Sequence, residues 1–340
     1  MRQDRPALSV VAALSGRTDA EFGVRDFVGR LNGLVASLDR AASTMPRGSV
    51  EVVVVDWNVV PDRPPLRDAL VVPERVSLRV VEVPAELHRR AVGDSGRHFH
   101  EYAAKNAGVV RARSGRVLFV TPDVLVRPDL VRFCVRAPLG DRAFVRADRY
   151  DFRAPDALDG PSVWPEPRPF VANVRHGASP SGGIVFPVDP ASPRSRWPRS
   201  RRLRGELGSS VIWGPRGGLP NHFLRGAHTH QCGDFICVSK AAWRAVGGFT
   251  EDPNIWLHCD SLFLAQLLGA NLRQVIYAKP GALLHEDHPR ATDEERGGGE
   301  ATWPAWLQRI QDIMDGRVLP RLNPGAFGLE DEDLPEYTIT

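Results

Sequence analysis

Hydrophobic runs alternate with helical periodicity along the first third of the chain. Leu8 to Leu14 and Val50 to Val55 are short and almost wholly apolar, which is typical of strands buried on both faces. Between them, apolar residues recur every three or four positions from Val24 to Leu38, the spacing of an amphipathic helix. Further elements are expected at 77–83 (strand), 100–111 (helix) and 117–120 (strand). This alternation predicts an α/β fold with a mostly parallel central sheet and helices on both faces.

The pattern weakens in the middle of the chain and returns near residue 231. Residues 151–230 are dominated by Pro, Gly, Arg and Ser, which predicts a long irregular insertion. Six arginines between positions 194 and 204 are interpreted as a solvated basic loop. The elements expected after the insertion are a strand at 234–238, a helix capped by Ser239 and ended by Gly247-Gly248, a helix starting near Asp260, and a strand at 274–277.

Composition narrows the range of partners and compartments. The 340 residues include 44 Lys and Arg against 41 Asp and Glu, a formal charge of +3. This surplus is too small to indicate non-specific binding to nucleic acid or anionic lipid. The four cysteines show no C-x-x-C spacing, so we expect a reducing, cytoplasmic location. No export signal and no uncharged apolar stretch of about 18 residues is found, so no integral membrane segment is expected.

Polar residues follow three of the expected strands. They are Ser15 and Arg17 after the first strand, Asp56 and Asn58 after the second, and Thr121 and Asp123 after the fourth. Ligands of open α/β sheets bind beyond the carboxyl ends of the parallel strands, so these residues should meet at one site.

Asp123 and His285 are candidate ligands of a divalent cation. A carboxylate directly after a strand can coordinate a hard cation that also binds a diphosphate, and Mn²⁺ accepts imidazole as well as oxygen ligands. Taken singly, Asp123 also fits a turn or a helix cap, and His285 fits an ordinary hydrogen-bonded histidine. The residues alone leave both interpretations open.

Three more polar residues belong to expected helices. Asp260 opens a helix, where it fits either an N-cap or a carboxylate that takes a proton from an attacking hydroxyl. Lys105 and Asn106 lie in a helix otherwise rich in Ala and Gly, which favours close packing with polar groups aimed at a nucleotide. A surface lysine and a helix-weakening asparagine are the alternative interpretation.

Six short segments occur together in a characteristic order. They are Asp-Trp-Asn at 56–58, Glu-Tyr-Ala-Ala-Lys-Asn-Ala-Gly at 101–108, Val-Leu-Phe-Val-Thr-Pro-Asp at 117–123, Gly-Asp-Phe at 233–235, Gly-Gly-Phe at 247–249 and Asp-Ser-Leu from Asp260. As an ordered set, over about 8–150 and 230–290, they resemble a bacterial family-2-type glycosyltransferase of the GT-A fold. Trp57-Asn58, followed by Pro64-Pro65, is also similar to exostosin-like transferases. The resemblance implies a GT-A-like, Rossmann-like sheet.

The resemblance also implies substrates and the residues that contact them. It implies an inverting hexosyltransferase that moves a sugar from a nucleotide-diphosphate donor, a UDP-sugar, to a hydroxyl of a glycan or specialised-metabolite acceptor. The implied donor contacts are Ser15, Arg17, Asp56, Asn58, Lys105, Asn106 and Thr121. Acceptor contacts are expected at Asp234 and at Trp256, because an aromatic ring can stack on the apolar face of a sugar.

The metal and the catalytic base follow from the same resemblance. Asp123 matches the last Asp of the D-x-D motif and His285 the late metal-binding histidine, so Mn²⁺ or Mg²⁺ is the expected cofactor. Asp260 matches the general base of the inverting enzymes. The sequence departs from the family at Thr121, where the first Asp of D-x-D usually stands, and at Cys259, where a Glu often precedes the catalytic Asp.

Two alternative functions remain open at this point. The departures at Thr121 and Cys259 motivate a transferase-like nucleotide-binding protein without turnover. A sugar nucleotidyltransferase would need a glycine-rich phosphate loop after the first strand, which Ser15-Gly16-Arg17-Thr18 does not supply.

The expected organisation has four parts. They are a nucleotide-sugar-binding half at 1–150, an insertion at 151–230 that is either on the acceptor side or partly mobile, an acceptor and catalytic half at 231–290, and a C-terminal extension with an acidic tail at 291–340.

Overall fold

The computed structural model describes most of the chain outside the expected insertion. The described residues are 5–15, 27–93, 97–147, 149–152, 168–169, 211–213, 223–224, 227–228, 232–253, 255, 259–277, 279, 281–286, 309–310, 312–313, 316–318, 321–323 and 325–340. The irregular insertion expected at 151–230 therefore lies almost wholly outside the described residues.

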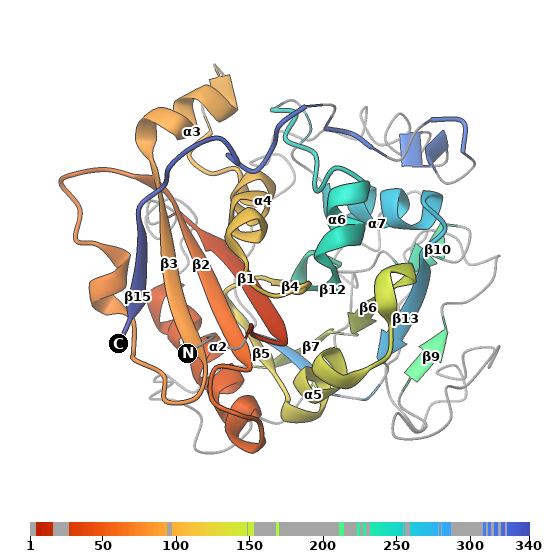
Figure 1. Ribbon diagram of the computed structural model, residues 1–340, viewed down its shortest axis with the longest axis horizontal. Coiled ribbons are helices and arrows are strands. Elements are labelled where there is room, and N and C mark those ends of the chain that lie inside the picture. The colour runs from red at the N-terminus through yellow and green to blue at the C-terminus, as the bar shows by residue number, and fades with distance from the viewer. Residues whose placement is uncertain are drawn as a thin grey trace.

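A nine-stranded sheet forms the centre of the fold (Figure 1). Its strands, in spatial order, are β15 (Glu336–Ile339), β3 (Ser77–Pro84), β2 (Val50–Val59), β1 (Leu8–Leu14), β4 (Arg116–Val120), β12 (Phe235–Ser239), β6 (Ala143–Ala147), β13 (Arg273–Tyr277) and β9 (Val211–Trp213). β1 to β4 are parallel, and β6 and β13 share their direction. Six of the nine strands therefore run in one direction, which confirms the mostly parallel sheet.

The three remaining strands run in the opposite direction. β12 lies between β4 and β6 and is antiparallel to both, while β15 and β9 are antiparallel additions at the two edges. All five residues of β12 are buried, as in the parallel strands. Burial on both faces therefore does not reveal the direction of a strand.

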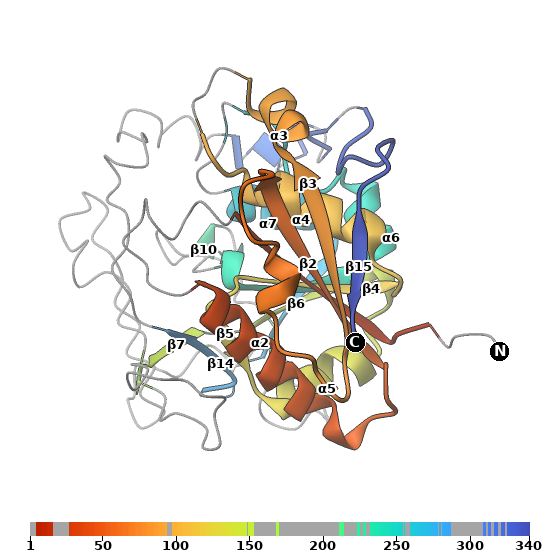
Figure 2. The same cartoon turned by 90° about the vertical axis from the view of Figure 1, so that its left-hand side faces the viewer.

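Helices cover both faces of the sheet, as expected. Two of them, α2 (Phe27–Ala41) and α5 (Pro128–Arg136), pack on one face. Four others, α3 (Ala85–Val92), α4 (Glu101–Arg111), α6 (Lys240–Ala245) and α7 (Cys259–Gly269), pack on the other. Figures 1 and 2 show the two groups on opposite sides of the strands.

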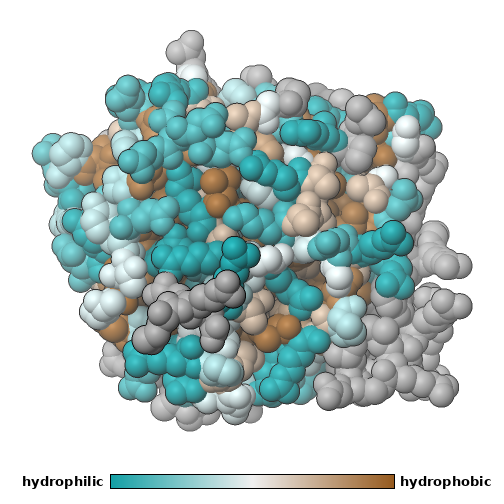
Figure 3. All heavy atoms as spheres, viewed as in Figure 1, coloured by the Kyte–Doolittle hydropathy of each residue, from teal (hydrophilic) through white to brown (hydrophobic). Residues whose placement is uncertain are grey.

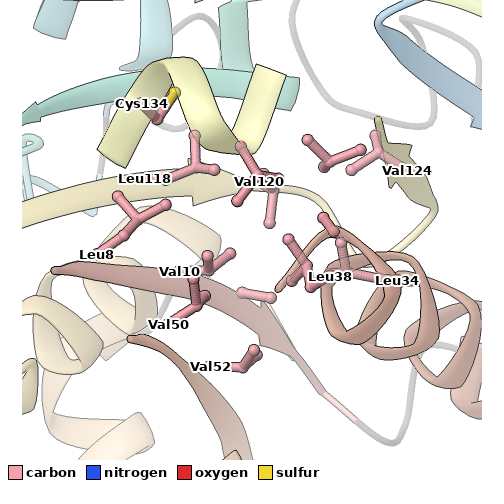
Figure 4. Packing of buried hydrophobic residues seen from close by; sticks show 14 of the residues in the cluster. Leu8, Val10, Leu34, Leu38, Val50, Val52, Leu118, Val120, Val124 and Cys134 are labelled. Atoms are coloured by element: carbon pink, nitrogen blue, oxygen red, sulfur yellow. The ribbon is translucent and has the colours of Figure 1, made fainter. Parts of the chain in front are cut away.

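Side-chain alternation along the strands fills two hydrophobic cores. In β1, Leu8 and Val10 point into the core under α2 and α5, whereas Val11 points into the core under α4. Figure 4 shows the first of these cores, where Leu34 and Leu38 of α2 face the sheet. On the other face α4 lies very close to β1, because a Cβ at Gly108 would lie 2.6 Å from Val11 Cγ1.

Local sequence signals end α6 where the sequence predicts. The Ser239 hydroxyl accepts a hydrogen bond of 3.0 Å from the Ala242 backbone N–H, the expected N-cap. Gly247 and Gly248 have φ angles of 79° and 69°, which glycine adopts without the cost that a Cβ would add. The glycine pair therefore turns the chain away after the helix.

A second, four-stranded sheet lies beside the first. Its order is β5 (Val124–Val126), β14 (Leu283–Glu286), β7 (Arg149–Phe152) and β8 (Arg168–Pro169), and a separate pair joins β10 (Phe223–Leu224) to β11 (Ala227–His228). His285 is aligned with Val124, directly after Asp123. The second sheet thus places residue 285, from the far end of the chain, next to the carboxyl end of β4.

The surface of the described residues is mainly polar. In Figure 3, apolar residues form small separate groups among polar ones. The large apolar side chains that are exposed among the described residues are Val71, Val72 and Val318. Within the same residues, helices long and apolar enough to cross a lipid bilayer are absent.

Candidate functional site

The carboxyl ends of β1, β2 and β4 form one edge of the central sheet. The register aligns Leu14, the last residue of β1, with Asp56 of β2. Ser15 follows β1 directly, and residues 121–123 follow β4. Adjacent parallel strands bring these residues together at the edge where ligands of α/β sheets bind.

Asp56 is a buried carboxylate at this edge. The strand continues through it to Val59, where the sequence predicts that the strand ends before Asp56. Burial raises the pKa of Asp56 from 3.8 to about 6, with Glu82 adding to the rise and Arg63 opposing it. Its Oδ1 atom is buried and has no hydrogen-bond partner among the described residues. An N–H group of a ligand would satisfy this acceptor.

Asn58 lies two residues further along β2, where the pairing with β3 shifts register between Trp57 and Val59. Its φ angle is 65°, an uncommon conformation that asparagine tolerates better than most residues. The side-chain Nδ2 donates to the carbonyl of His98 at 3.1 Å. Asn58 thus ties the end of β2 to the segment before α4.

Asp123 and His285 form a close pair. Their Oδ2 and Nε2 atoms lie 3.1 Å apart, and both side chains are at least nine-tenths buried. The backbone also joins the two segments, since the N–H of Glu286 donates to the carbonyl of Asp123 at 3.0 Å. The structure therefore brings together the two residues that the sequence indicates as metal ligands.

A short 3₁₀ turn, η7 (Cys232–Asp234), connects this pair to the other candidate residues. The Asp234 carboxylate forms a buried ion pair with Arg149 at 2.9 Å and accepts a long contact of 3.5 Å from the Thr121 hydroxyl. Thr121 lies two residues before Asp123. Asp234 therefore holds the segment that leads to Asp123, and protein groups occupy both of its oxygens.

Asp260 contacts the other side of the same turn. Its Oδ2 accepts a hydrogen bond of 2.8 Å from the Gly233 N–H, and its Oδ1 accepts one of 2.8 Å from the Ser261 N–H. The side chain is only partly buried. The Ser261 hydroxyl also lies 3.5 Å from Oδ1, and the Cys232 thiol hydrogen-bonds the same carboxylate. The η7 turn thus contacts Asp260 through Gly233 and, through Asp234, Thr121, which lies two residues before Asp123.

Lys105 and Asn106 of α4 are fully buried. Lys105 Nζ donates to the Gly233 carbonyl at 3.1 Å and pairs with Glu101 at 2.6 Å. Asn106 donates to the Phe249 carbonyl and to Glu251, and accepts from Trp243 Nε1 and the Phe249 N–H, at 2.8 to 3.2 Å. These four bonds use every donor and acceptor of an amide. The expected nucleotide contact therefore has no hydrogen-bonding capacity left at Asn106.

Two of the expected site residues lie outside the described residues. They are Arg17, expected to contact the donor, and Trp256, expected to contact the acceptor. The described residues contain no group of three or more His, Cys, Asp or Glu side chains arranged to hold a metal ion. Asp123 and His285 therefore supply two candidate ligands, one fewer than such a group requires.

The sequence did not indicate three residues that contact the candidate site residues, which are Arg149, Gly233 and Tyr102. Arg149 pairs with Asp234, and Gly233 joins Lys105 to Asp260. A Cβ at Gly233 would lie 3.1 Å from Asp260 Oδ2 and 3.5 Å from the Tyr102 hydroxyl. Burial and the nearby Asp260 raise the pKa of Tyr102 well above its usual 10, so the phenol stays protonated. The glycine in Gly-Asp-Phe was a usable signal, but arginine is too common in this chain for Arg149 to stand out.

Solved structures with a similar fold include proteins that bind nucleotide sugars. The Staphylococcus aureus protein TarS, residues 1–349, matches in complex with UDP (12% identity, 90% of this chain and 64% of that chain, TM-score 0.45) and in complex with UDP-GlcNAc (12%, 90%, 65%, 0.46). The mannosyltransferase PcManGT from Pyrobaculum calidifontis, in complex with GDP-Man and Mn²⁺, matches with 13% identity, 92% of this chain, 70% of that chain and a TM-score of 0.43.

The similarity does not extend beyond the general fold. The chain spans slightly less than two thirds of the length of the TarS structures with UDP and UDP-GlcNAc. No protein-family model and no curated protein matches the sequence. At 12–13% identity and TM-scores below 0.5, these matches carry no information about activity.

Proposed function

We propose that the protein is an inverting glycosyltransferase that moves a sugar from a UDP-sugar to a hydroxyl group of a glycan or small-molecule acceptor. The observation that carries the proposal is that one short turn at the carboxyl edge of the sheet contacts both Asp260, through Gly233, and Thr121, two residues before Asp123, through Asp234. Such a transfer needs a group that binds the leaving diphosphate and a base for the acceptor hydroxyl. The two carboxylates supply one of each.

Asp123 and His285 fit a divalent cation. Two neighbouring ligands of an octahedral Mg²⁺ or Mn²⁺, each about 2.1 Å from the ion, are about 3 Å apart, and Nε2 and Oδ2 are 3.1 Å apart. One carboxylate and one imidazole suit Mn²⁺. A cation held by these two residues would also be able to bind the diphosphate of the donor. When bound, the cation would neutralise charge that develops on the departing diphosphate.

The donor nucleotide is proposed to lie along the ends of β1 and β2. Asp56 offers a buried acceptor oxygen there, which fits an N–H donor such as that of a uracil ring. Ser15, fully buried at the end of β1, and Thr121 after β4 border the same edge. Lys105 and Asn106 are left out of this contact set because they are fully buried and hydrogen-bonded to protein groups.

The chemical step places Asp260 opposite the leaving group. The acceptor oxygen attacks the anomeric carbon and forms a new C–O bond, while the bond from that carbon to the diphosphate oxygen breaks and its electron pair leaves with UDP. The acceptor proton passes to the Asp260 carboxylate, which the Gly233 and Ser261 N–H groups hold in place. Attack from the face opposite the diphosphate inverts the configuration.

The reaction is proposed to occur in the cytoplasm. All four cysteines are free and buried, which suits a reducing compartment.

Asp260→Asn tests the assigned base. Turnover of a UDP-sugar, measured as UDP release with Mn²⁺ from a panel of UDP-glucose, UDP-galactose and UDP-GlcNAc, is expected to fall by at least ~100-fold. Calorimetry is expected to show unchanged affinity for UDP, since the substitution keeps the shape of the side chain. Asp129→Asn, a carboxylate in the first turn of α5 outside the site, should leave both quantities unchanged.

Two results would overturn the proposal. UDP binding without turnover by the wild-type protein would indicate a nucleotide-binding protein of transferase-like fold. Equal turnover by the wild-type and Asp260→Asn proteins would give Asp260 only a structural role, as a carboxylate in the first turn of α7.

A further inference from the structure

Lys105 is a charged side chain with no exposed surface, in the middle of α4. A buried ammonium group is costly unless charges and hydrogen bonds compensate it. Glu101, one helical turn earlier, balances the charge at 2.6 Å. The Gly233 carbonyl, 128 positions along the chain, accepts a bond of 3.1 Å from the same nitrogen. The lysine thus connects α4 to the turn before β12.

Gly233 is hydrogen-bonded to both Lys105 and Asp260. Its carbonyl accepts from Lys105, and its N–H donates to Asp260 Oδ2 at 2.8 Å. The fit is tight, since a Cβ at this position would lie only 3.1 Å from that oxygen. A movement of Gly233 toward or away from Lys105 therefore moves the hydrogen bond that orients the carboxylate.

The second oxygen of Asp260 cannot replace this orientation. Oδ1 accepts from the N–H of Ser261, the next residue of α7, and this contact moves with the helix itself. The contacts from another part of the chain come from η7, where the Gly233 N–H donates to Oδ2 and the Cys232 thiol also hydrogen-bonds the carboxylate. They fix the rotation of the carboxylate relative to the sheet edge that holds Asp123.

We propose that Lys105 is a positioning residue that fixes the Asp260 carboxylate through the backbone of Gly233. This inference rests on the proposed function, in which Asp260 is the base. It replaces a direct contact between Lys105 and the nucleotide. The lysine has no exposed surface, and Glu101 already balances its charge. A misplacement of about 1 Å in a reacting group can cost on the order of 100-fold in rate.

The first experiment is a double-mutant cycle between Lys105→Met and Asp260→Asn. Lys105→Met keeps the apolar stem and removes the ammonium group. It is expected to lower kcat for UDP-sugar turnover by ~10- to 100-fold, with KM for the donor and affinity for UDP unchanged. In the Asp260→Asn protein the same change is expected to lower kcat by less than about 2-fold, because the base through which it acts is gone.

Lys240→Met is the matched control. Lys240, the first residue of α6, also donates to backbone carbonyls, those of Val110 and Ala112 at 2.9 and 2.8 Å. These carbonyls lie at the other end of α4. Its loss is expected to lower thermal stability with kcat unchanged, which separates general destabilisation from the effect on Asp260.

A second experiment requires no turnover. Hydrogen exchange of the Gly233 amide, which donates to Asp260, is expected to accelerate at least ~10-fold in Lys105→Met and to remain unchanged in Lys240→Met. If Lys105→Met does not fold, Lys105→Leu, which also removes the ammonium group and keeps an apolar side chain, replaces it in both experiments.

The outcomes separate this inference from the proposed function. A raised KM with unchanged kcat, additive losses in the cycle, or unchanged Gly233 exchange would each overturn the positioning role. Full turnover by Asp260→Asn would instead overturn the assignment of the base, while Gly233 exchange would still show whether Lys105 holds the turn.

Discussion

At the scale of single residues, Asp56 shows how burial changes the pKa of a carboxyl group at the candidate site. Asp56 carries an ionisable group where burial disfavours the charged form. In the folded protein its pKa is about 6, against 3.8 for the unfolded chain. Between these values the folded state binds the proton more tightly than the unfolded state does. The Asp56 contribution to stability therefore becomes less favourable as pH rises from about 4 to about 6, and stays so above it.

Asp56→Asn is expected to remove this pH-dependent cost. At about 1.4 kcal/mol per pKa unit, the variant should be more stable than the wild type by on the order of 2–3 kcal/mol at pH 8, and equally stable at pH 4. Urea unfolding of both proteins at a series of pH values measures the difference. A constant difference between pH 4 and pH 8 would show that Asp56 is ionised without cost in the folded protein.

Residues at strand ends were predictable, whereas hydrogen-bond partners were not. Asp123 was found because it follows an apolar strand, and the structure places it against His285. Asn106 was chosen from a helix pattern that is equally consistent with a buried structural amide. Its partners near Phe249 are 143 positions away, so no local pattern could identify them.

At the scale of elements, α4 contacts the candidate site through one residue and a buried polar network through the next. Lys105 faces the η7 turn, and the next residue, Asn106, holds the chain that follows α6. Glu251 accepts from Asn106 and from the Gly328 N–H at 2.8 Å, and burial raises the pKa of Glu251 to about 7. Asn106 therefore organises a buried polar network between three segments.

Asn106→Asp is expected to disrupt that network. The new carboxyl oxygen would face the Phe249 carbonyl and the Glu251 carboxylate. All three groups accept hydrogen bonds, so none of them would have a donor there. We expect a loss of at least ~3 kcal/mol at pH 8 and a smaller loss at pH 5, where protonated carboxyls can donate. Urea unfolding measures both losses. Asn32→Asp, at an exposed amide that bonds the Ala69 carbonyl and the Val71 N–H, is the control and should cost less than about 1 kcal/mol.

UDP affinity distinguishes this role from a nucleotide contact. The folded fraction of Asn106→Asp is expected to bind UDP as the wild type does. A loss of UDP affinity with unchanged stability would restore the contact implied by the family resemblance.

Long periodic elements were predictable, and short strands were not. The observed bounds of β1, β3 and α4 lie within one residue of the expected ones. The second sheet was missed because its strands have two to four residues, too few to show alternation. Yet β14 carries His285, so the Asp123–His285 pair depends on an element whose sequence gives no strand signal.

At the scale of the whole molecule, the described C-terminal segment, residues 321–323 and 325–340, packs on the rest of the fold. The acidic stretch at 330–333, which the sequence presents as a tail, lies on the fold: Glu330 pairs with Arg244 and Glu332 with Arg90. The Phe327 ring packs against Trp243, with centroids 5.0 Å apart. In Figure 2 the segment runs to β15, beside β3. The C-terminal segment therefore completes both a core and an edge of the sheet.

A buried network of charges joins this segment to the sheet. Glu336 of β15 pairs with Arg79 of β3, which also bonds Glu51 of β2 at 3.1 Å. Glu51 in turn accepts from the Ser9 hydroxyl of β1. Four adjacent strands thus share one line of polar contacts, and β15 supplies its outer carboxylate.

Removal of residues 335–340 is therefore expected to destabilise the whole fold. The truncation exposes the backbone hydrogen-bonding groups of β3 at a new edge of the sheet. It also removes Glu336, the carboxylate that pairs with the nearly buried Arg79. We expect a loss of at least ~3 kcal/mol in urea unfolding and concentration-dependent association in ultracentrifugation. Glu330→Gln, which breaks only a surface ion pair, should cost less than about 1 kcal/mol and leave the protein monodisperse. A truncated protein as stable as the full chain would contradict this prediction. It would show that the other strands are stable without the pairing of β15 with β3.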